Sequence, residues 1–217
     1  MNLEQIKKEV VALALECGAF MQKEAESFDY SKVELKGKND LVSYGDKELE
    51  IMIATRLKEV LPEAGFITEE GTQKADNNPL KWVIDPLDGT TNFIHGLPVY
   101  CTSIALIDAN ELLVGVVYEP SRNECFHAYK GGGAFCNDKR IHVSKLNKIS
   151  DSLLATGFPF YDFEKISNYV KILNELMQNA HGLRRLGSAA VDLAYVAMGR
   201  YEAYFEYNLN SWDLAAG

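Results

Sequence analysis

The stretch WVIDPLDGTTNF, residues 82–93, runs from an apolar segment directly into two aspartates, a proline, a glycine and two threonines. Its first three residues are aromatic or β-branched, which favours a short buried strand. Pro86 holds the preceding residue in extended backbone and cannot donate a hydrogen bond to a sheet ladder. We therefore expect the strand to end at Asp85.

The residues after this strand are suited to begin a helix. Gly89 can adopt backbone conformations that other residues rarely adopt, and Thr90 or Thr91 is a good residue for a helix start. The first N–H groups of a helix have no partner within the helix and can bind a phosphate. The turn thus offers donors for an anion.

The same turn offers oxygen ligands for a cation. Asp85 and Asp88 are three residues apart, and the carbonyl of Leu87 lies between them. Carboxylate and carbonyl oxygens suit a hard divalent cation such as Mg²⁺. The alternative is an ordinary Asx-type turn, which the pattern D-P-x-D-G fits equally well on these residues alone. An EF-hand is excluded because the alternating aspartates and the closing glutamate are absent.

Length and charge limit the classes of partner. The chain has 217 residues, 47% hydrophobic and 24% charged, which predicts one or two globular domains with a sizeable core. Its formal net charge is −9, which argues against direct nucleic-acid binding because such surfaces carry an excess of lysine and arginine. A small phosphorylated substrate would then need a metal to offset the negative charge.

The N-terminus and the cysteines indicate a cytoplasmic protein without a membrane segment. Charged residues interrupt each apolar run of MNLEQIKKEVVALALECGAF, so it is neither a signal peptide nor a membrane span. The four cysteines lack C-x-x-C spacing and are too few for a disulfide scaffold. We interpret them as reduced core residues.

Hydrophobic spacing divides the chain into two parts. Helices are expected over residues 3–26, 46–60, 163–178 and 188–198. Strands are expected over residues 65–68, 99–108 and 111–120, on either side of three glycines within 124–137, and over 153–158 and 201–207. The segment LKGKND, residues 35–40, is expected to be a polar loop. These elements predict an α+β part over residues 1–147, with an antiparallel sheet, and an α/β part over residues 148–217.

The last ten residues, NLNSWDLAAG, again place an aspartate after a strand end. Asp213 is expected in the first turn of a helix, yet the sequence ends four residues later. A helix this short is not stable alone, so we expect a further segment after Gly217 and an incomplete second part.

Four acidic residues are expected to converge at one sheet edge. Each lies at a predicted strand end or in the turn that follows: Glu69, Asp85, Asp88 and Asp213. Strand ends on the same edge of a layered fold meet, so these carboxylates could surround two or three cations. The set lacks histidine and cysteine, which disfavours zinc and favours Mg²⁺ or Mn²⁺.

Three motifs stand out along the chain: WVIDPLDGTTNFIHGLP from Trp82, the upstream EEG from Glu69, and the terminal WDLAAG from Trp212. Together they resemble the inositol monophosphatase family of Mg²⁺-dependent, lithium-sensitive phosphatases. The resemblance covers essentially the whole chain in order. It implies a layered αβαβα sandwich of the inositol monophosphatase and fructose-1,6-bisphosphatase type, and a homodimer.

The resemblance also implies metal ligands. Glu69, Asp85 and the Leu87 carbonyl would hold the first ion, and Asp85, Asp88 and Asp213 the second. Glu69 would share a third ion and act in catalysis. The implied chemistry is an in-line attack of water on a phosphate monoester, with metals at the attacking and leaving oxygens.

The remaining site residues are implied in the same way. Thr90 with Asp46 would orient the attacking water, and the backbone of Gly89 and Thr90 would hold the phosphate. Ala189 and Glu206 match positions that contact the hydroxyl-bearing ring of the substrate.

The substrate is expected to be inositol 1-phosphate or a similar polyol or sugar phosphate. Adenosine 3′,5′-bisphosphate, fructose 1,6-bisphosphate and histidinol phosphate remain alternatives, because the metal motifs do not separate them. A different class is a regulatory binding protein of the transcription machinery. Arg184 and Arg185 are interpreted as a surface or interface pair, with anion binding as the alternative.

Overall fold

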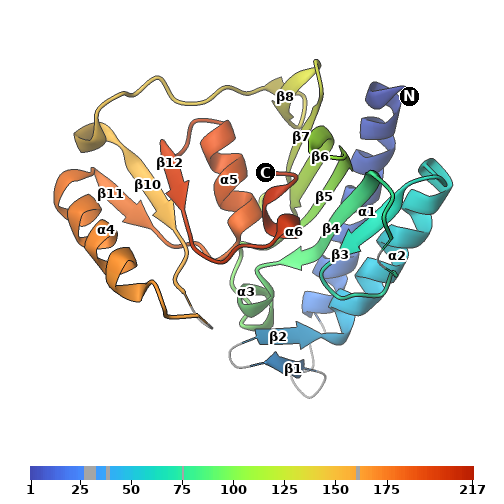
Figure 1. The fold of residues 1–217 in the computed structure, drawn as a ribbon, viewed down its shortest axis with the longest axis horizontal. Coiled ribbons are helices and arrows are strands. Elements are labelled where there is room, and N and C mark those ends of the chain that lie inside the picture. Colours follow the sequence, from blue (N-terminus) through green and yellow to red (C-terminus); the bar gives the residue numbers. More distant parts are fainter. Residues whose placement is uncertain (27–32, 38–39, 75, 160–161) are drawn as a thin grey trace.

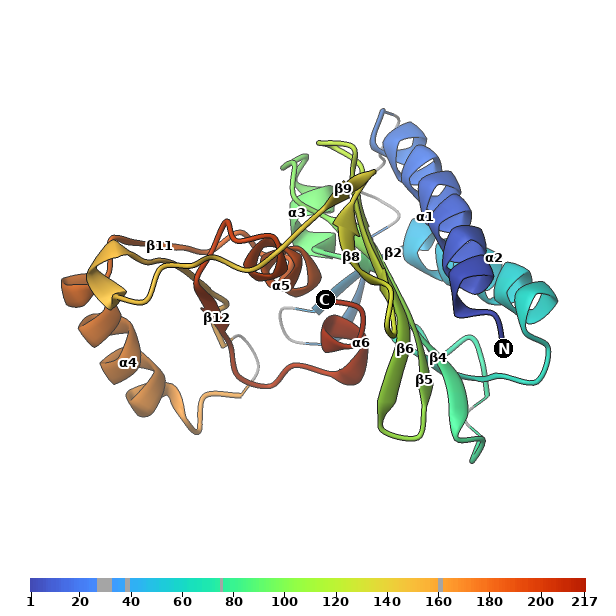
Figure 2. The ribbon, with the colours of Figure 1, turned by 90° about the horizontal axis from the view of Figure 1, so that it is seen from above.

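The protein forms alternating layers of helices and sheets in a computed structural model that describes residues 1–26, 33–37, 40–74, 76–159 and 162–217, with side chains outside 33–44. Figure 2 shows the layers in order: α1 with α2, the large sheet, α5 with α6, the small sheet, and α4. This arrangement confirms the predicted layered α+β sandwich. None of the described helices is long and apolar enough to cross a membrane.

Two long helices cover one face of the large sheet. They are α1 (Leu3–Glu26) and α2 (Tyr44–Val60), and both confirm predicted helices, although α2 begins two residues early. Apolar residues at helical spacing in α1, including Val10, Leu13 and Cys17, are buried against the sheet. All four cysteines are buried and free, as expected of core residues.

The large sheet has seven strands within the described residues, in the order β3-β4-β5-β6-β7-β8-β9. Their bounds are β3 Gly65–Thr68, β4 Leu80–Asp88, β5 Cys101–Asp108, β6 Glu111–Glu119, β7 Glu124–Tyr129, β8 Gly133–Cys136 and β9 Lys139–Arg140. Only the β3–β4 pair is parallel. The two predicted hairpins, β5–β6 and β7–β8, are confirmed.

Strand β4 continues past the residue at which we expected it to end. Its pairing with β5 has a β-bulge between Asp85 and Asp88, and it resumes where Asp88 faces Cys101. Pro86 is tolerated because its missing N–H falls in this bulge, beyond the last β3–β4 pair at Ile84. The Pro86 carbonyl still accepts a hydrogen bond from Thr102 Oγ1 at 3.0 Å. The prediction that the strand ends at Asp85 is therefore wrong.

The small sheet lies on the other side of α5. Its order is β11-β10-β12, all parallel, with bounds β10 Leu153–Thr156, β11 Gly182–Arg184 and β12 Ala203–Phe205. Strand β11 was not predicted, because HGLRRLG has no alternation of apolar and polar residues. Helix α5 (Ala189–Ala197) confirms its prediction to within one residue at each end. Helix α4 (Ile166–Asn179) begins three residues later than expected, after a turn in which Asp162 Oδ1 accepts the Glu164 N–H.

A second core joins the two sheets through α5. Ala190, Val191 and Ala194 of α5 pack with Val117 and Phe126 from the large sheet. Figure 1 shows α5 and the short α6 (Ser211–Leu214) lying between the two sheets. The ends of β4, α5 and α6 are thereby brought into one region.

A β-hairpin occurs where we expected the polar loop LKGKND. Strands β1 (Val33–Gly37) and β2 (Asp40–Ser43) pair antiparallel, with Leu35 opposite Leu41, so the loop prediction is wrong over the strand residues. The apolar residues that flank the polar ones favour pairing over a loop. Residues 38–39 lie outside the described residues. The division of the chain near residue 147 stays a prediction.

Candidate active site

Asp85 lies at the centre of the predicted acidic group. It is only 2% exposed, and its Oδ1 accepts the Leu87 N–H at 3.0 Å, as in an Asx-type turn. Burial raises the pKa of Asp85 well above its ordinary value, and the charges of Glu69, Asp88 and Asp213 raise it further. The turn and the acidic cluster are thus present together, and neither sequence interpretation excludes the other.

Asp88 connects the end of β4 to the start of α5. Its Oδ2 accepts hydrogen bonds from Ser188 Oγ and from the Ala190 N–H, both at 2.7 Å. Burial raises the pKa of Asp88, while these donors and the Arg185 charge oppose the rise. The residue therefore holds the two parts of the protein together across the site.

Gly89 makes the turn from β4 into α3 (Thr90–Ile94), and the helix begins at Thr90, one of the two start residues that we predicted. Its φ is 93°, a left-handed conformation that side chains disfavour. A Cβ at this position would lie 2.9 Å from the Val99 carbonyl oxygen and 3.2 Å from Tyr100 Cα. Both the backbone conformation and the packing therefore require glycine.

Thr90 and Asp46 lie together, as the resemblance implied. Asp46 is 1% exposed near the start of α2, and its Oδ1 lies 3.5 Å from Thr90 Oγ1. The hydroxyl also lies 2.9 Å from the Leu87 carbonyl oxygen, to which it can donate. A hydroxyl has one proton and two lone pairs, so donation to either oxygen leaves Thr90 able to accept a hydrogen bond from a water.

Glu69 directly follows β3 and is adjacent to the end of β4. Its N–H donates to the Ile84 carbonyl at 3.3 Å, and its side chain is half-buried beside Asp85. The next residues are bonded to Glu50, a fully buried carboxylate from α2. Sequence reasoning missed Glu50. The only sign of its role in the sequence is that it is a charged residue on the apolar face of an amphipathic helix.

Asp213 lies in α6, where it forms a capping box with Asn210. Its Oδ2 accepts the Asn210 N–H at 2.6 Å. Burial, followed by the charges of Asp88 and Glu206, raises the pKa of Asp213 to about 7. Ser103 Oγ of β5 donates to the Trp212 carbonyl at 3.1 Å, which fixes α6 on the large sheet.

The two predicted ring-contacting residues lie on the α5 and β12 side. Ala189 is buried at the first position of α5. Glu206 follows β12 and accepts a hydrogen bond from the Tyr204 hydroxyl. Burial raises the pKa of Glu206, and the Arg185 charge lowers it. Arg185 thus acts electrostatically on the site, although the sequence favoured a surface role for it.

Asp192 of α5 is a buried acid that sequence reasoning missed. It is 1% exposed, and its Oδ1 has no hydrogen-bond partner within the described structure. Burial raises its pKa to about 8, helped by the charges of Asp88 and Glu206 and opposed by Arg185. The available signal was a single acid in the otherwise apolar helix AAVDLAYVA.

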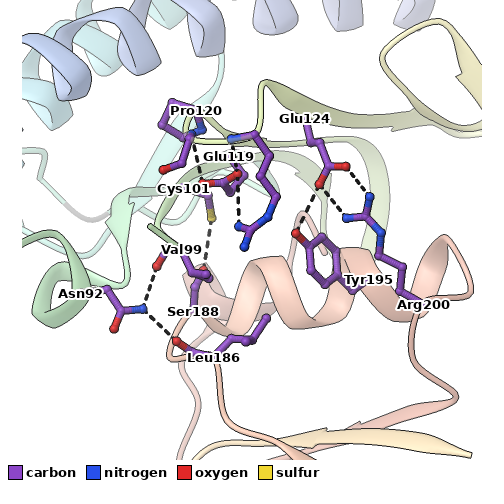
Figure 3. A network of polar contacts seen from close by, with 12 residues as sticks. Asn92, Val99, Cys101, Glu119, Pro120, Glu124, Leu186, Ser188, Tyr195 and Arg200 are labelled. Atoms are coloured by element: carbon purple, nitrogen blue, oxygen red, sulfur yellow. Dashed lines mark hydrogen bonds and ion pairs between the residues drawn. The ribbon is translucent and has the colours of Figure 1, made fainter. Parts of the chain in front are cut away.

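Asn92 fixes the segment that leads into α5. Its Nδ2 donates to the Val99 carbonyl at 2.7 Å and to the Leu186 carbonyl at 2.8 Å (Figure 3). The same view shows Cys101 Sγ beside Ser188 Oγ, at 3.6 Å. These contacts place the start of α5 against α3 and β5.

The donor types at the site fit a hard divalent cation. They are carboxylates and one backbone carbonyl, and each carboxylate acts on the pKa of another. Among the described residues, no group of three or more His, Cys, Asp or Glu side chains already stands in an arrangement that could hold a metal ion. The acids nevertheless act on one another, because Glu69 is hydrogen-bonded to Asp85 and the charges of Asp88 and Asp213 also act on the Asp85 pKa.

Comparison with known proteins gives a consistent result. The profile of the inositol monophosphatase family matches residues 2–217. Inositol-1-monophosphatase of Mesorhizobium japonicum is 39% identical over 96% of this chain and 79% of its own length. Nus factor SuhB of Escherichia coli is 42% identical over 95% of this chain and 78% of its own length. The solved structure of extragenic suppressor protein suhB from Bartonella henselae has a TM-score of 0.91 and 38% identity, covering 96% of this chain and 81% of that one.

Proposed function

Since the chain belongs to the inositol monophosphatase family of phosphoric monoester hydrolases, we propose that it releases phosphate from inositol 1-phosphate or a similar polyol or sugar phosphate. The observation that carries the proposal is the grouping of acids around Asp85, whose pKa is raised first by burial and then by the charges of Glu69, Asp88 and Asp213. Buried acids that repel one another are costly unless they serve a cation.

We assign Mg²⁺ to this group, with Mn²⁺ as an alternative. The proposed ligands are the carboxylates of Glu69, Asp85, Asp88 and Asp213 and the Leu87 carbonyl. When bound, such ions would offset the charge on the phosphate and on the oxygens that enter and leave. The acids supply the negative potential that attracts the ions.

Thr90 and Asp46 would orient the attacking water. Asp46 is buried and its Oδ1 lies 3.5 Å from Thr90 Oγ1, so the hydroxyl proton can point toward it or toward the Leu87 carbonyl. The lone pairs of Thr90 would then accept a hydrogen bond from the water and hold it on one line with the phosphorus. Glu69 would assist as a nearby acceptor. The N–H groups of Gly89 and Thr90 would hold the phosphate oxygens.

The α5 and β12 side would select the alcohol. A Glu206 carboxylate accepts hydrogen bonds from ring hydroxyls, and Ala189 leaves room beside it. The carboxylates of Asp88 and Glu206 repel a second phosphate, and the charge of Arg185, which attracts it, already acts on Glu206. A neutral polyol is therefore favoured over a bisphosphate.

Phosphate release from the full chain, with and without Mg²⁺, tests the proposal. The substrates are inositol 1-phosphate, adenosine 3′,5′-bisphosphate and fructose 1,6-bisphosphate. We expect Mg²⁺-dependent release, greatest with inositol 1-phosphate, and a loss of about a hundredfold or more in Asp85→Asn. The matched control Asp108→Asn, an exposed acid in the neighbouring strand β5, should retain activity. Equal release without divalent ions would refute the metal-dependent mechanism.

A regulatory role is a second candidate, and the observation favouring it is the similarity to a Nus factor. A double role predicts that Asp85→Asn loses hydrolysis yet binds purified bacterial RNA polymerase as well as the unaltered chain does. Surface plasmon resonance with both proteins would measure this. Failure of the unaltered chain to bind would remove this candidate.

A further inference from the structure

Glu50 of α2 is a buried carboxylate whose bonds all reach one short loop. It is 0% exposed and accepts the Glu70 N–H at 2.6 Å, the Thr72 N–H at 2.8 Å and the Thr72 hydroxyl at 2.7 Å. We propose that Glu50 is a positioning residue that holds the loop after β3, and with it Glu69, ready for the divalent cation. The inference rests on the proposed function of the site.

The loop is held from two directions. On one side, the Glu69 N–H donates to the Ile84 carbonyl of β4 at 3.3 Å. On the other side, Glu50 bonds the residue directly after Glu69 and then Thr72, across Gly71 with its φ of 68°. Glu69 therefore has its backbone fixed before any ion binds. Less conformational freedom is lost on binding when a ligand is already in place.

The role of holding the loop after β3 explains why the carboxylate of Glu50 is buried. A carboxylate without water is costly unless donors surround it, and charge-assisted hydrogen bonds are the strongest available. The donors here come from residues 20 and 22 positions away, so they are supplied only when the loop is folded. Glu50 thus favours one loop conformation strongly.

The same helix also positions the water-orienting pair. Asp46 and Glu50 are four residues apart, which places them on one face of α2. That helix is anchored by Leu49, Ile53 and Leu57, which are at most 1% exposed. One rigid element therefore sets both Asp46 beside Thr90 and the loop that carries Glu69.

Mn²⁺ binding tests the role without relying on activity. Free Mn²⁺ is followed by electron paramagnetic resonance as the ion is titrated into the full chain. We expect Glu50→Gln and Glu50→Asp each to raise the dissociation constant by about tenfold or more. The aspartate keeps the negative charge, but its shorter side chain does not reach the loop N–H groups. It therefore distinguishes the positioning of the loop from the electrostatic attraction of the ion by the charge. Thr72→Val removes no charge; it removes the hydroxyl that donates to Glu50 at 2.7 Å and accepts a long bond from Gln73 Nε2 at 3.4 Å, and it should raise the constant by about threefold.

The matched control is Glu59→Gln, an exposed acid on the same helix with a side chain 72% exposed. It should change the dissociation constant less than about twofold, because exposed charges are screened. Hydrogen exchange at the Glu70 and Thr72 amides gives a second measurement. Both should exchange faster in Glu50→Gln and Glu50→Asp, and the Thr72 amide faster in Thr72→Val.

The outcomes separate this inference from the proposed function. If the unaltered chain binds Mn²⁺ and Glu50→Asp binds it equally well, the positioning role is wrong while the metal site stands. If the unaltered chain binds no Mn²⁺, the metal site and the positioning role are both overturned. Should Glu50→Gln fail to fold, Thr72→Val decides: unchanged affinity and unchanged exchange would refute the inference.

Discussion

Glu50 and Asp192 are buried to the same degree on opposite sides of the site, yet their surroundings differ. Glu50 comes from α2, which covers the large sheet, and is 0% exposed with three hydrogen bonds to the loop after β3. Asp192 comes from α5, between the sheets, and is 1% exposed with Oδ1 lacking a partner in the described structure.

The difference shows that hydrogen-bond donors, rather than burial alone, decide what a buried acid does. The bonded carboxylate of Glu50 is committed to holding structure. Asp192 has a pKa raised to about 8 by burial and by the charges of Asp88 and Glu206, so it stays protonated in neutral solution. Burying this group without a partner for Oδ1 lowers the stability of the fold, and Oδ1 can still accept a hydrogen bond from another group.

Removing the Glu50 charge should have the largest effect. Glu50→Gln replaces an acceptor oxygen with an NH₂ group that cannot accept the loop N–H, so we expect a loss of about 3 kcal/mol in the free energy of unfolding. Urea unfolding followed by circular dichroism measures it. Glu59→Gln, on the exposed part of α2, should change stability by less than about 0.5 kcal/mol. Equal losses in the two variants would show that the bonds from Glu50 to the loop do not stabilise the fold.

The turn at Gly89 is closely packed. The free energy of unfolding should be the next most sensitive to a substitution there. Gly89→Ala meets a φ of 93° and a Cβ position 2.9 Å from the Val99 carbonyl oxygen, which predicts a loss of about 2 kcal/mol. Gly96→Ala is the matched control, since its φ is 67° but nothing lies within 4 Å. It should lose only about 1 kcal/mol. A larger loss at Gly96 would show that backbone conformation, not crowding, dominates.

Asp192→Asn should stabilise the protein in alkaline solution, in contrast to Glu50→Gln. The folded pKa of about 8 exceeds the ordinary 3.8, so the folded chain retains a proton that the unfolded chain loses. Stability contributed by Asp192 is therefore complete below pH 4 and is lost as pH rises to about 8. We expect the variant to be at least about 1.5 kcal/mol more stable than the unaltered chain at pH 8, since each unit of pKa shift is worth about 1.4 kcal/mol.

Thermal unfolding at several pH values, without divalent ions, measures this difference. The advantage of Asp192→Asn should shrink toward zero near pH 4, where both chains carry a neutral group. The exposed acid in Asp138→Asn provides the control and should show no such trend. A stability difference independent of pH would mean that folding does not raise the pKa of Asp192.

Asp213 is intermediate between the two acids, because it accepts one backbone N–H and has a pKa of about 7. A cation must displace its proton, so Mn²⁺ affinity should rise by about tenfold between pH 6 and pH 8. Calorimetry in buffers of different ionisation enthalpy would detect the released proton. No proton release at pH 6 would show that Asp213 is already ionised or does not bind the ion.

Local patterns predicted most elements because each depends on neighbouring residues. Apolar spacing located α1, α2 and α5, and the two-residue gap between the strands predicted over 99–108 and 111–120, together with the three glycines within 124–137, located the hairpins. The start of α3 at Thr90 followed from Gly89 in the same way. Residue types and the family resemblance predicted the acids at the strand ends, and the structure brings Glu69, Asp88 and Asp213 within electrostatic reach of Asp85. Their assignment as ligands stays a prediction.

Short motifs in the sequence resembled the family, and this resemblance predicted the layered fold; the residue types at the predicted strand ends named four candidate acids. Three features became visible only in the folded chain: β4 continues through Pro86, Glu50 bonds the loop beside Glu69, and Asp192 Oδ1 has no hydrogen-bond partner among the described residues. Such features depend on residues that are distant in the sequence. The same is true of Asp88, which accepts the Ala190 N–H from 102 residues away. Local patterns say which groups need partners, and only packing in three dimensions determines which of them find one.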